Sequence, residues 1–61
     1  MATQQMSIYE ATMIAEGAQY AEEDEVIRAW QLLHDTRTAY SLQGFFGRTA
    51  RSLIEQGIIE E

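Results

Sequence analysis

The stretch EEDEVIRAWQLLHDT, residues 22–36, decides the fold class of this chain. Its apolar side chains recur at helical spacing from Val26 to Leu33, with Trp30 on the same stripe, as in a helix that packs one face against a core. Its acidic residues come first, where the dipole of a helix favours negative charge. The stretch therefore predicts an amphipathic helix over residues 22–35.

A shorter helix is predicted upstream, over residues 8–16. Ser7 and Glu10 have the spacing of a capping box, in which each side chain accepts a hydrogen bond from a backbone N–H of the first turn. Gly17 follows the last apolar position of this segment. Glycine is the residue that most readily adopts the left-handed conformation that ends a helix, so the helix is expected to stop there.

Downstream, two short helices are predicted to meet at a glycine-rich corner. Thr36 and Thr38 are cap-forming residue types, so a helix is expected to begin near one of them. Gly44 and Gly47 bracket a pair of phenylalanines, and either glycine is able to end that helix. Helical spacing then resumes and continues to a further glycine, Gly57, after which two isoleucines are expected to fold back on the core.

The whole chain is therefore predicted to be all-α, a small compact bundle of three to four short helices. Its 61 residues contain no proline and four glycines, and no alternating pattern is long enough for a half-buried strand. Residues 7–61 are expected to form one domain, and residues 1–6, which precede the cap, to be disordered. The predicted core consists of Ile8, Ile14, Val26, Trp30, Leu33, Leu42, Phe46, Leu53 and Ile54.

Composition argues against most catalytic and metal-binding functions. The chain has no cysteine and one histidine, His34, so neither a disulfide nor a zinc site is expected. His34 is expected to lie in the last turn of its helix, where it interacts favourably with the dipole. No phosphate-binding loop, metalloprotease motif or nucleophile elbow is present. We expect no enzyme activity, no catalytic residue, no cofactor and no metal.

Charge and hydropathy bear on the partners. The net charge of −6 disfavours nucleic acid and anionic membranes as partners of the whole chain. No apolar run approaches the roughly 20 residues that cross a bilayer, so a cytoplasmic protein is expected. Apolar residues make up 46% of the chain, more than a small core readily hides, and the acidic N-terminal half complements the arginines further on. These features predict a homo-oligomer.

The stretch LQGFFGRTARSLIEQG, residues 42–57, carries the candidate binding residues. Adjacent residues on a helix point about 100° apart, so only one of Phe45 and Phe46 readily faces the core. Phe46 fits the apolar stripe, which leaves Phe45 for the surface. Aromatic residues and arginines are enriched at binding hot spots. We predict a partner-binding surface of Phe45, Arg48, Arg51 and Arg37.

Two alternatives stay open for this stretch. In the first, Phe45 packs under the N-terminal helix and the arginines pair with Glu10, Glu16 or Glu55, so that the stretch has a structural role only. In the second, the stretch is the recognition end of a helix-turn-helix, with Arg48 and Arg51 near phosphates or bases. Two arginines are few for such a role, since a strong binder of DNA makes about 6–10 phosphate contacts.

Three blocks, IYEATMIAEG, AWQLLHDT and LQGFFGRTARSLIEQG, occur in this order along the chain. Together they resemble a group of small bacteriophage-encoded proteins. That group favours glycine at the position of Arg37, so the turn there is expected to be less sharp in this chain. The resemblance implies a small acidic phage-type module that binds and modulates a host protein or complex. A self-assembling structural protein and a small DNA-binding regulator are the alternatives.

Overall fold

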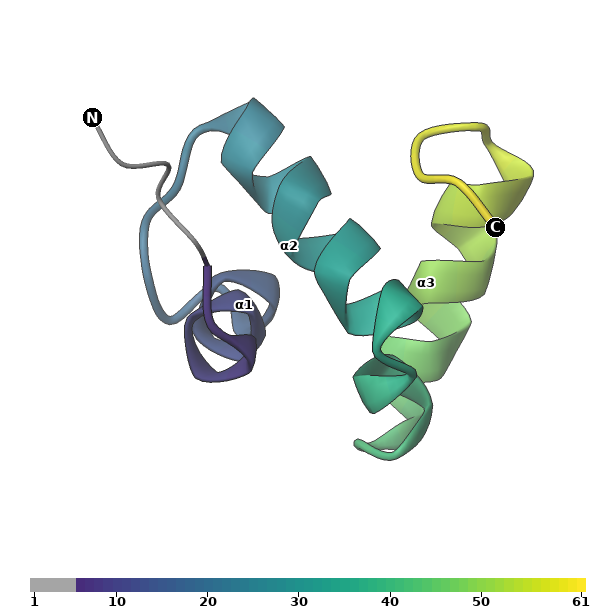
Figure 1. Cartoon of the computed structure of the whole chain (residues 1–61), viewed down its shortest axis with the longest axis horizontal. Coiled ribbons are helices and arrows are strands. Elements are labelled where there is room, and N and C mark those ends of the chain that lie inside the picture. The colour runs from purple at the N-terminus through teal and green to yellow at the C-terminus, as the bar shows by residue number, and fades with distance from the viewer. Residues whose placement is uncertain (1–5) are drawn as a thin grey trace.

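The computed structural model describes residues 6–61, and within them the chain is helical with no strand. The elements are, in order, α1 (Ile8–Glu16), α2 (Glu23–Asp35), the 3-10 helix η1 (Thr38–Tyr40) and α3 (Gly44–Glu55). α1 and α3 lie on opposite sides of α2, and α2 and α3 diverge from the end where η1 connects them (Figure 1). The predicted all-α fold of three to four short helices is confirmed.

The first helix has the predicted bounds, and its two ends show why. The Ser7 hydroxyl accepts a hydrogen bond from the backbone N–H of Glu10 at 3.0 Å, and Gly17 ends the helix in the left-handed conformation with φ 83°. The Glu10 carboxylate accepts instead from the side-chain amide of Gln19 at 3.3 Å. The Ser7 half of the predicted capping box is therefore present, and Glu10 connects the helix to the following loop.

The second helix begins one residue later than predicted, because Glu22 is its N-cap. The backbone N–H of Glu22 donates to the carboxylate of Glu25 at 3.0 Å. At the other end, Arg37 adopts the left-handed conformation with φ 64°, and its backbone N–H donates to the carbonyl of His34 at 2.9 Å. The expectation of a less sharp turn at Arg37 is therefore wrong. The chain makes the tight turn with a non-glycine residue.

The predicted corner at Gly44 and Gly47 is also wrong. Both glycines lie at the start of α3, and among residues 6–61 the glycines with positive φ are Gly17 and Gly57. The chain reverses earlier, through η1 and residues 41–43, so the helix expected near Thr36 or Thr38 is a single 3-10 turn. Gly47 instead lets a neighbouring element approach α3 closely, since the ring of Tyr40 packs against it.

The core is small and rich in alanine. Ala11, Ala29, Ala39 and Ala50 are fully buried, and Leu33 is the one large side chain among residues 6–61 with the same degree of burial. The other buried apolar residues are Ile14, Trp30, Phe46 and Ile59. Small side chains at the contacts bring the helix backbones close together, which limits the volume left for larger residues.

Four of the predicted core residues are buried: Ile14, Trp30, Leu33 and Phe46. Three more, Val26, Leu53 and Ile54, are partly buried and pack against the core. Ile8 and Leu42 are 44% and 36% exposed, so their assignment to the core is wrong. Ile8 is the first residue of α1, and Leu42 lies in the turn before α3, where neighbouring elements cover only one side of a side chain.

The two ends of the described chain both pack against the core. Met6 is partly buried against it, so packing begins at Met6, inside the segment predicted to be disordered. The rest of that prediction falls on residues 1–5, outside the described residues. At the other end, Gly57 turns the chain with φ 78°. Ile59 folds back as predicted, at 3% exposure, whereas Ile58 stays 41% exposed.

Candidate functional site

The structure separates the predicted binding residues into two sites, which lie along two different sides of α3. At 100° per residue, Phe45 and Arg51 lie roughly 120° apart around α3, with Arg48 between them on the exposed face. Phe45 lines one hollow, whereas Arg51 and Arg37 line another. The predicted surface is therefore two sites that share α3.

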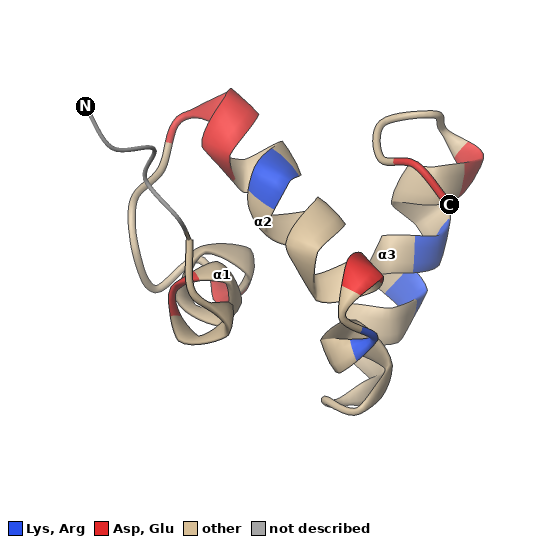
Figure 2. Ribbon diagram, in the orientation of Figure 1, with Lys and Arg blue, Asp and Glu red and all other residues tan. Residues whose placement is uncertain are grey.

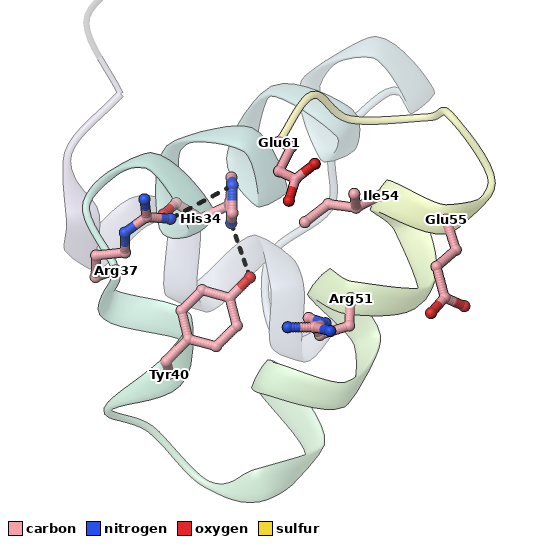
Figure 3. A pocket seen from close by; sticks show the side chains of 7 residues that line it. All are labelled: His34, Arg37, Tyr40, Arg51, Ile54, Glu55 and Glu61. Atoms are coloured by element: carbon pink, nitrogen blue, oxygen red, sulfur yellow. Dashed lines mark hydrogen bonds between the residues drawn. The ribbon is translucent and has the colours of Figure 1, made fainter.

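The first site is a cavity of about 490 Å³, called here the arginine cavity. The end of α2, the turn with η1, one side of α3 and the C-terminal segment surround it, and it is open to solvent (Figure 3). Its lining residues are His34, Arg37, Tyr40, Arg51, Ile54, Glu55 and Glu61. The cavity thus joins two predicted arginines to a histidine and a tyrosine.

His34 forms the inner wall of the arginine cavity and is only 5% exposed. Its Nδ1 lies 2.7 Å from the hydroxyl oxygen of Tyr40, and its Nε2 lies 3.5 Å from Nη1 of Arg37. The same guanidinium nitrogen donates to the backbone carbonyl of His34 at 3.3 Å. The predicted position in the last turn of α2 is confirmed. Its burial and both ring contacts were not predicted.

The hydrogen bonds assign a tautomer to His34. A guanidinium has only donors, so Nε2 beside Arg37 is the acceptor and the proton of the neutral ring is on Nδ1. Nδ1 then donates to the oxygen of Tyr40. The ring of Tyr40 also stands edge-on to the imidazole, with centroids 5.7 Å apart. Each polar atom of the imidazole is therefore matched to a partner of the right kind.

The arginines of this region have no acidic partner of their own. Among residues 6–61, no carboxylate oxygen lies within 4.0 Å of Arg37, Arg48 or Arg51. Figure 2 shows the arginines of α3 on the side of that helix away from α1, and an acidic cluster at the start of α2. The alternative in which the arginines pair with nearby glutamates is therefore wrong. Nη1 of Arg37 already donates to His34, and the remaining guanidinium donors are able to bind a ligand.

The second site is an apolar surface made of two hollows. One is a groove of about 290 Å³ between α2 and α3, with Glu23 and Thr49 beside its apolar residues Val26, Ile27, Trp30, Leu53 and Ile58. The other, of about 270 Å³, lies at the start of α3 and is lined by Glu16, Leu42, Gln43, Phe45 and Phe46. We call the two hollows together the apolar surface.

Trp30 lines the groove, and its ring contacts a residue of the other hollow. The ring of Phe45 stands edge-on to that of Trp30, with centroids 6.2 Å apart and planes at 80°. The ring of Phe46 also contacts that of Trp30, with centroids 5.9 Å apart. Phe46 is 4% exposed and Phe45 45%, so the prediction that Phe46 faces the core and Phe45 the surface is confirmed.

Sequence reasoning missed several residues of both sites. Tyr40 and His34 meet through a 3-10 turn that no helical periodicity indicates. Ile27 and Ile58 line the groove from two elements far apart in sequence, and only the tertiary fold places them together. One signal was available, because Ile27 stands beside the predicted apolar stripe of α2 and widens it.

Three further findings bear on the class of site. No helix of residues 6–61 combines the length and the hydropathy that a bilayer crossing requires. In the same residues, no three histidine or acidic side chains are grouped as they would be around a metal ion. Comparisons of the chain with protein-family models, with curated proteins and with solved structures find no match.

Proposed function

We propose that this chain is a small protein-binding module that modulates another protein or complex, a host protein if the chain is phage-encoded as the resemblance implies. The observation that carries the proposal is the apolar surface. It joins the partly exposed side chains of Phe45, Leu42 and Ile58, at 45%, 36% and 41% exposure, to the buried ring of Trp30. Connected apolar area of this kind is typical of protein interfaces.

Phe45 is the anchor of the proposed interface. Its edge-on contact with Trp30 and its contact with Phe46, at a centroid distance of 4.8 Å, fix the ring before any partner arrives. A side chain that is already ordered loses little conformational entropy on binding. Large aromatic residues in such positions are enriched among hot spots.

Arg48 supplies the polar rim of the same interface. It occupies the exposed face of α3 next to Phe45, and its guanidinium bends back along the helix, within 2.9 Å of where a Cβ of Gly44 would stand. Charge-assisted hydrogen bonds from such a group to carboxylates of a partner are among the stronger polar contacts. A hydrophobic anchor with a charged rim matches the general anatomy of protein interfaces.

Self-association is the second candidate, and one observation favours it. Tyr9 and Tyr20 are 74% and 86% exposed, and Ile8 is 44% exposed, all outside the apolar surface. A homo-oligomer would cover some of this area. DNA binding is supported less well, because the net charge is −6 and Phe45 stands in the first turn of α3, where a recognition helix presents residues to bases.

The experiment compares Phe45→Ala with a matched control, Tyr20→Ala, which removes an aromatic ring outside the apolar surface. Proteins captured from a host lysate are identified by mass spectrometry with the original chain as bait, and the affinity of the purified partner is measured for each variant. The proposal expects Phe45→Ala to weaken binding by about 2 kcal/mol or more and Tyr20→Ala to leave it unchanged. Circular dichroism confirms that both variants are folded.

Sedimentation over a range of concentrations separates the two candidates. If the measured mass of the original chain rises with concentration and that of Phe45→Ala does not, the apolar surface is assigned to self-association. A single-chain mass that stays constant on concentration would contradict the predicted homo-oligomer. Equal partner binding by Phe45→Ala and the original chain would contradict the proposed anchor.

A further inference from the structure

We propose that the arginine cavity binds a carboxylate group from an acidic segment of a partner protein, held by Arg51, Arg37 and the hydroxyl of Tyr40. The inference deepens the proposed function and rests on it for the source of the carboxylate. It concerns a different side of α3 from Phe45, and the two hollows share no lining residue, so the two sites can be tested independently.

The first argument concerns the proton of the Tyr40 hydroxyl. Because Nδ1 of His34 donates to this oxygen at 2.7 Å, the hydroxyl acts as an acceptor toward the imidazole. Its own proton is then left to donate elsewhere. Among residues 6–61 no acceptor takes this proton, and the hydroxyl stands at the arginine cavity (Figure 3). Tyr40 is 40% exposed, so the cavity presents this donor to solvent or to a ligand.

The second argument concerns the two guanidinium groups. Arg51 reaches the cavity from α3 and Arg37 from the turn after α2 (Figure 3). Arg37 holds its place through a left-handed backbone, at φ 64°, and through its hydrogen bond to the carbonyl of His34. A non-glycine residue in this conformation is strained, and such strain is concentrated at binding sites. Both arginines line the same cavity, and guanidinium donors suit an oxyanion.

The third argument concerns Glu61, which selects a carboxylate as the ligand. The side-chain amide of Gln31 donates to the carbonyl of Glu60 at 2.8 Å and accepts from its N–H at 2.7 Å. This pair holds the C-terminal segment over the cavity, with Glu61 among the lining residues (Figure 3). Glu61 and Glu55 make two of the lining residues negatively charged, so a singly charged carboxylate is repelled less than a phosphate dianion. A phosphate dianion would add negative charge beside Glu55.

The probes of the test are small molecules, so no host protein is needed. A blocked peptide with two adjacent glutamates, its glutamine analogue and inorganic phosphate are each titrated into the full chain at about 0.15 M salt, where long-range repulsion is screened. NMR signals of the arginine Nε–H groups and of the Tyr40 ring report binding. We expect saturable shifts of Arg51, Arg37 and Tyr40 with the glutamate peptide and none with its analogue.

Four variants make the test specific. Arg51→Gln is expected to lower the affinity for the glutamate peptide about tenfold or more, because a hydrogen bond to a charged group is lost. Arg28→Gln is the matched control, since Arg28 is exposed on α2 and lines no part of the cavity. Glu61→Gln is expected to strengthen binding, because it removes a negative charge from the lining of the cavity. Tyr40→Phe, which keeps the ring, is expected to weaken it.

The proposal is overturned if the glutamate peptide causes no saturable shift, or if Arg28→Gln weakens binding as much as Arg51→Gln. Tighter binding of phosphate than of the peptide would overturn the choice of a carboxylate. Weaker binding in Glu61→Gln would overturn the role of Glu61. None of these outcomes depends on Phe45, so the proposed role of Phe45 as an anchor is tested separately by its own experiment.

Discussion

The ring of Tyr40 packs against the backbone of Gly47, so closely that a Cβ at Gly47 would lie 3.4 Å from Cδ1 and 3.9 Å from Cε1 of that ring. The carbonyl oxygen of Ala39 would lie 3.8 Å from the same Cβ. These are van der Waals distances, so a single methyl group just fits and nothing larger does. Gly47 thereby sets how near η1 can come to α3, and with it the position of the Tyr40 hydroxyl.

Gly47→Ala and Gly47→Leu are therefore expected to change the free energy of unfolding in opposite directions. Alanine favours a helix over glycine by up to about 1 kcal/mol and fits beside Tyr40, so Gly47→Ala should retain or raise the free energy of unfolding. Leucine must push the ring away, at a cost of roughly 1–3 kcal/mol, and should also lengthen the contact between Tyr40 and His34. Urea unfolding measures the free energy of unfolding of each variant. Equal stabilities for the two variants would contradict the close packing.

Arg37→Gly and Arg37→Ala form a second pair. Both variants lose the side-chain contacts with His34, but the left-handed backbone at φ 64° costs alanine roughly 1 kcal/mol that glycine does not incur. The glycine variant should therefore unfold at higher urea concentration than the alanine variant. If alanine proves the more stable of the two, Arg37 is not left-handed in solution.

Leu33→Ala is expected to unfold most of the protein. Leu33 is fully buried, and truncation of such a leucine costs about 2.7–5 kcal/mol, as much as the roughly 3–5 kcal/mol that a core of this size supplies. Leu42→Ala is the control, since Leu42 is 36% exposed and should cost far less. Far-ultraviolet circular dichroism at increasing temperature compares them. A larger loss for Leu42→Ala would reverse the assignment of the core.

Gln31→Ala tests the attachment of the C-terminal segment. Removing both hydrogen bonds to the backbone of Glu60 should cost about 1–3 kcal/mol and speed amide hydrogen exchange at Ile59 and Glu60. Gln56→Ala is the matched control, because Gln56 is exposed and, among residues 6–61, its amide bonds to Ser52, four residues before it. Unchanged exchange in Gln31→Ala would show that the segment is held without Gln31.

The parts of the fold that were predicted correctly depend on local chemistry. The Ser7 cap and the left-handed Gly17 bound α1 by interactions within a few residues, and the apolar stripe of α2 needs only its own periodicity. Capping and amphipathic spacing can be recognised without knowing what the helix packs against. The bounds of these two helices were accordingly right to within one residue.

The errors arose where tertiary contacts, rather than the local sequence, determine the structure. Gly44 and Gly47 were interpreted as turn residues, but glycine in a helix is also used where another element must come close, and the sequence does not distinguish these uses. Ile8 and Leu42 were assigned to the core by hydrophobicity, whereas alanines took much of the buried space. The arginine cavity was beyond prediction, because Arg37 and Arg51 meet only after the chain has reversed through η1.

The arrangement of neighbours along the chain also has a kinetic consequence. α1 packs mainly on α2, and η1 packs on both α2 and α3, so most elements contact those adjacent in sequence. Few distant segments must find each other before contacts begin to form, and helical proteins with such local topology fold in microseconds to milliseconds. A nascent chain could thus pair its first two helices before the third has left the ribosome, so that α2 is already partly covered when α3 arrives.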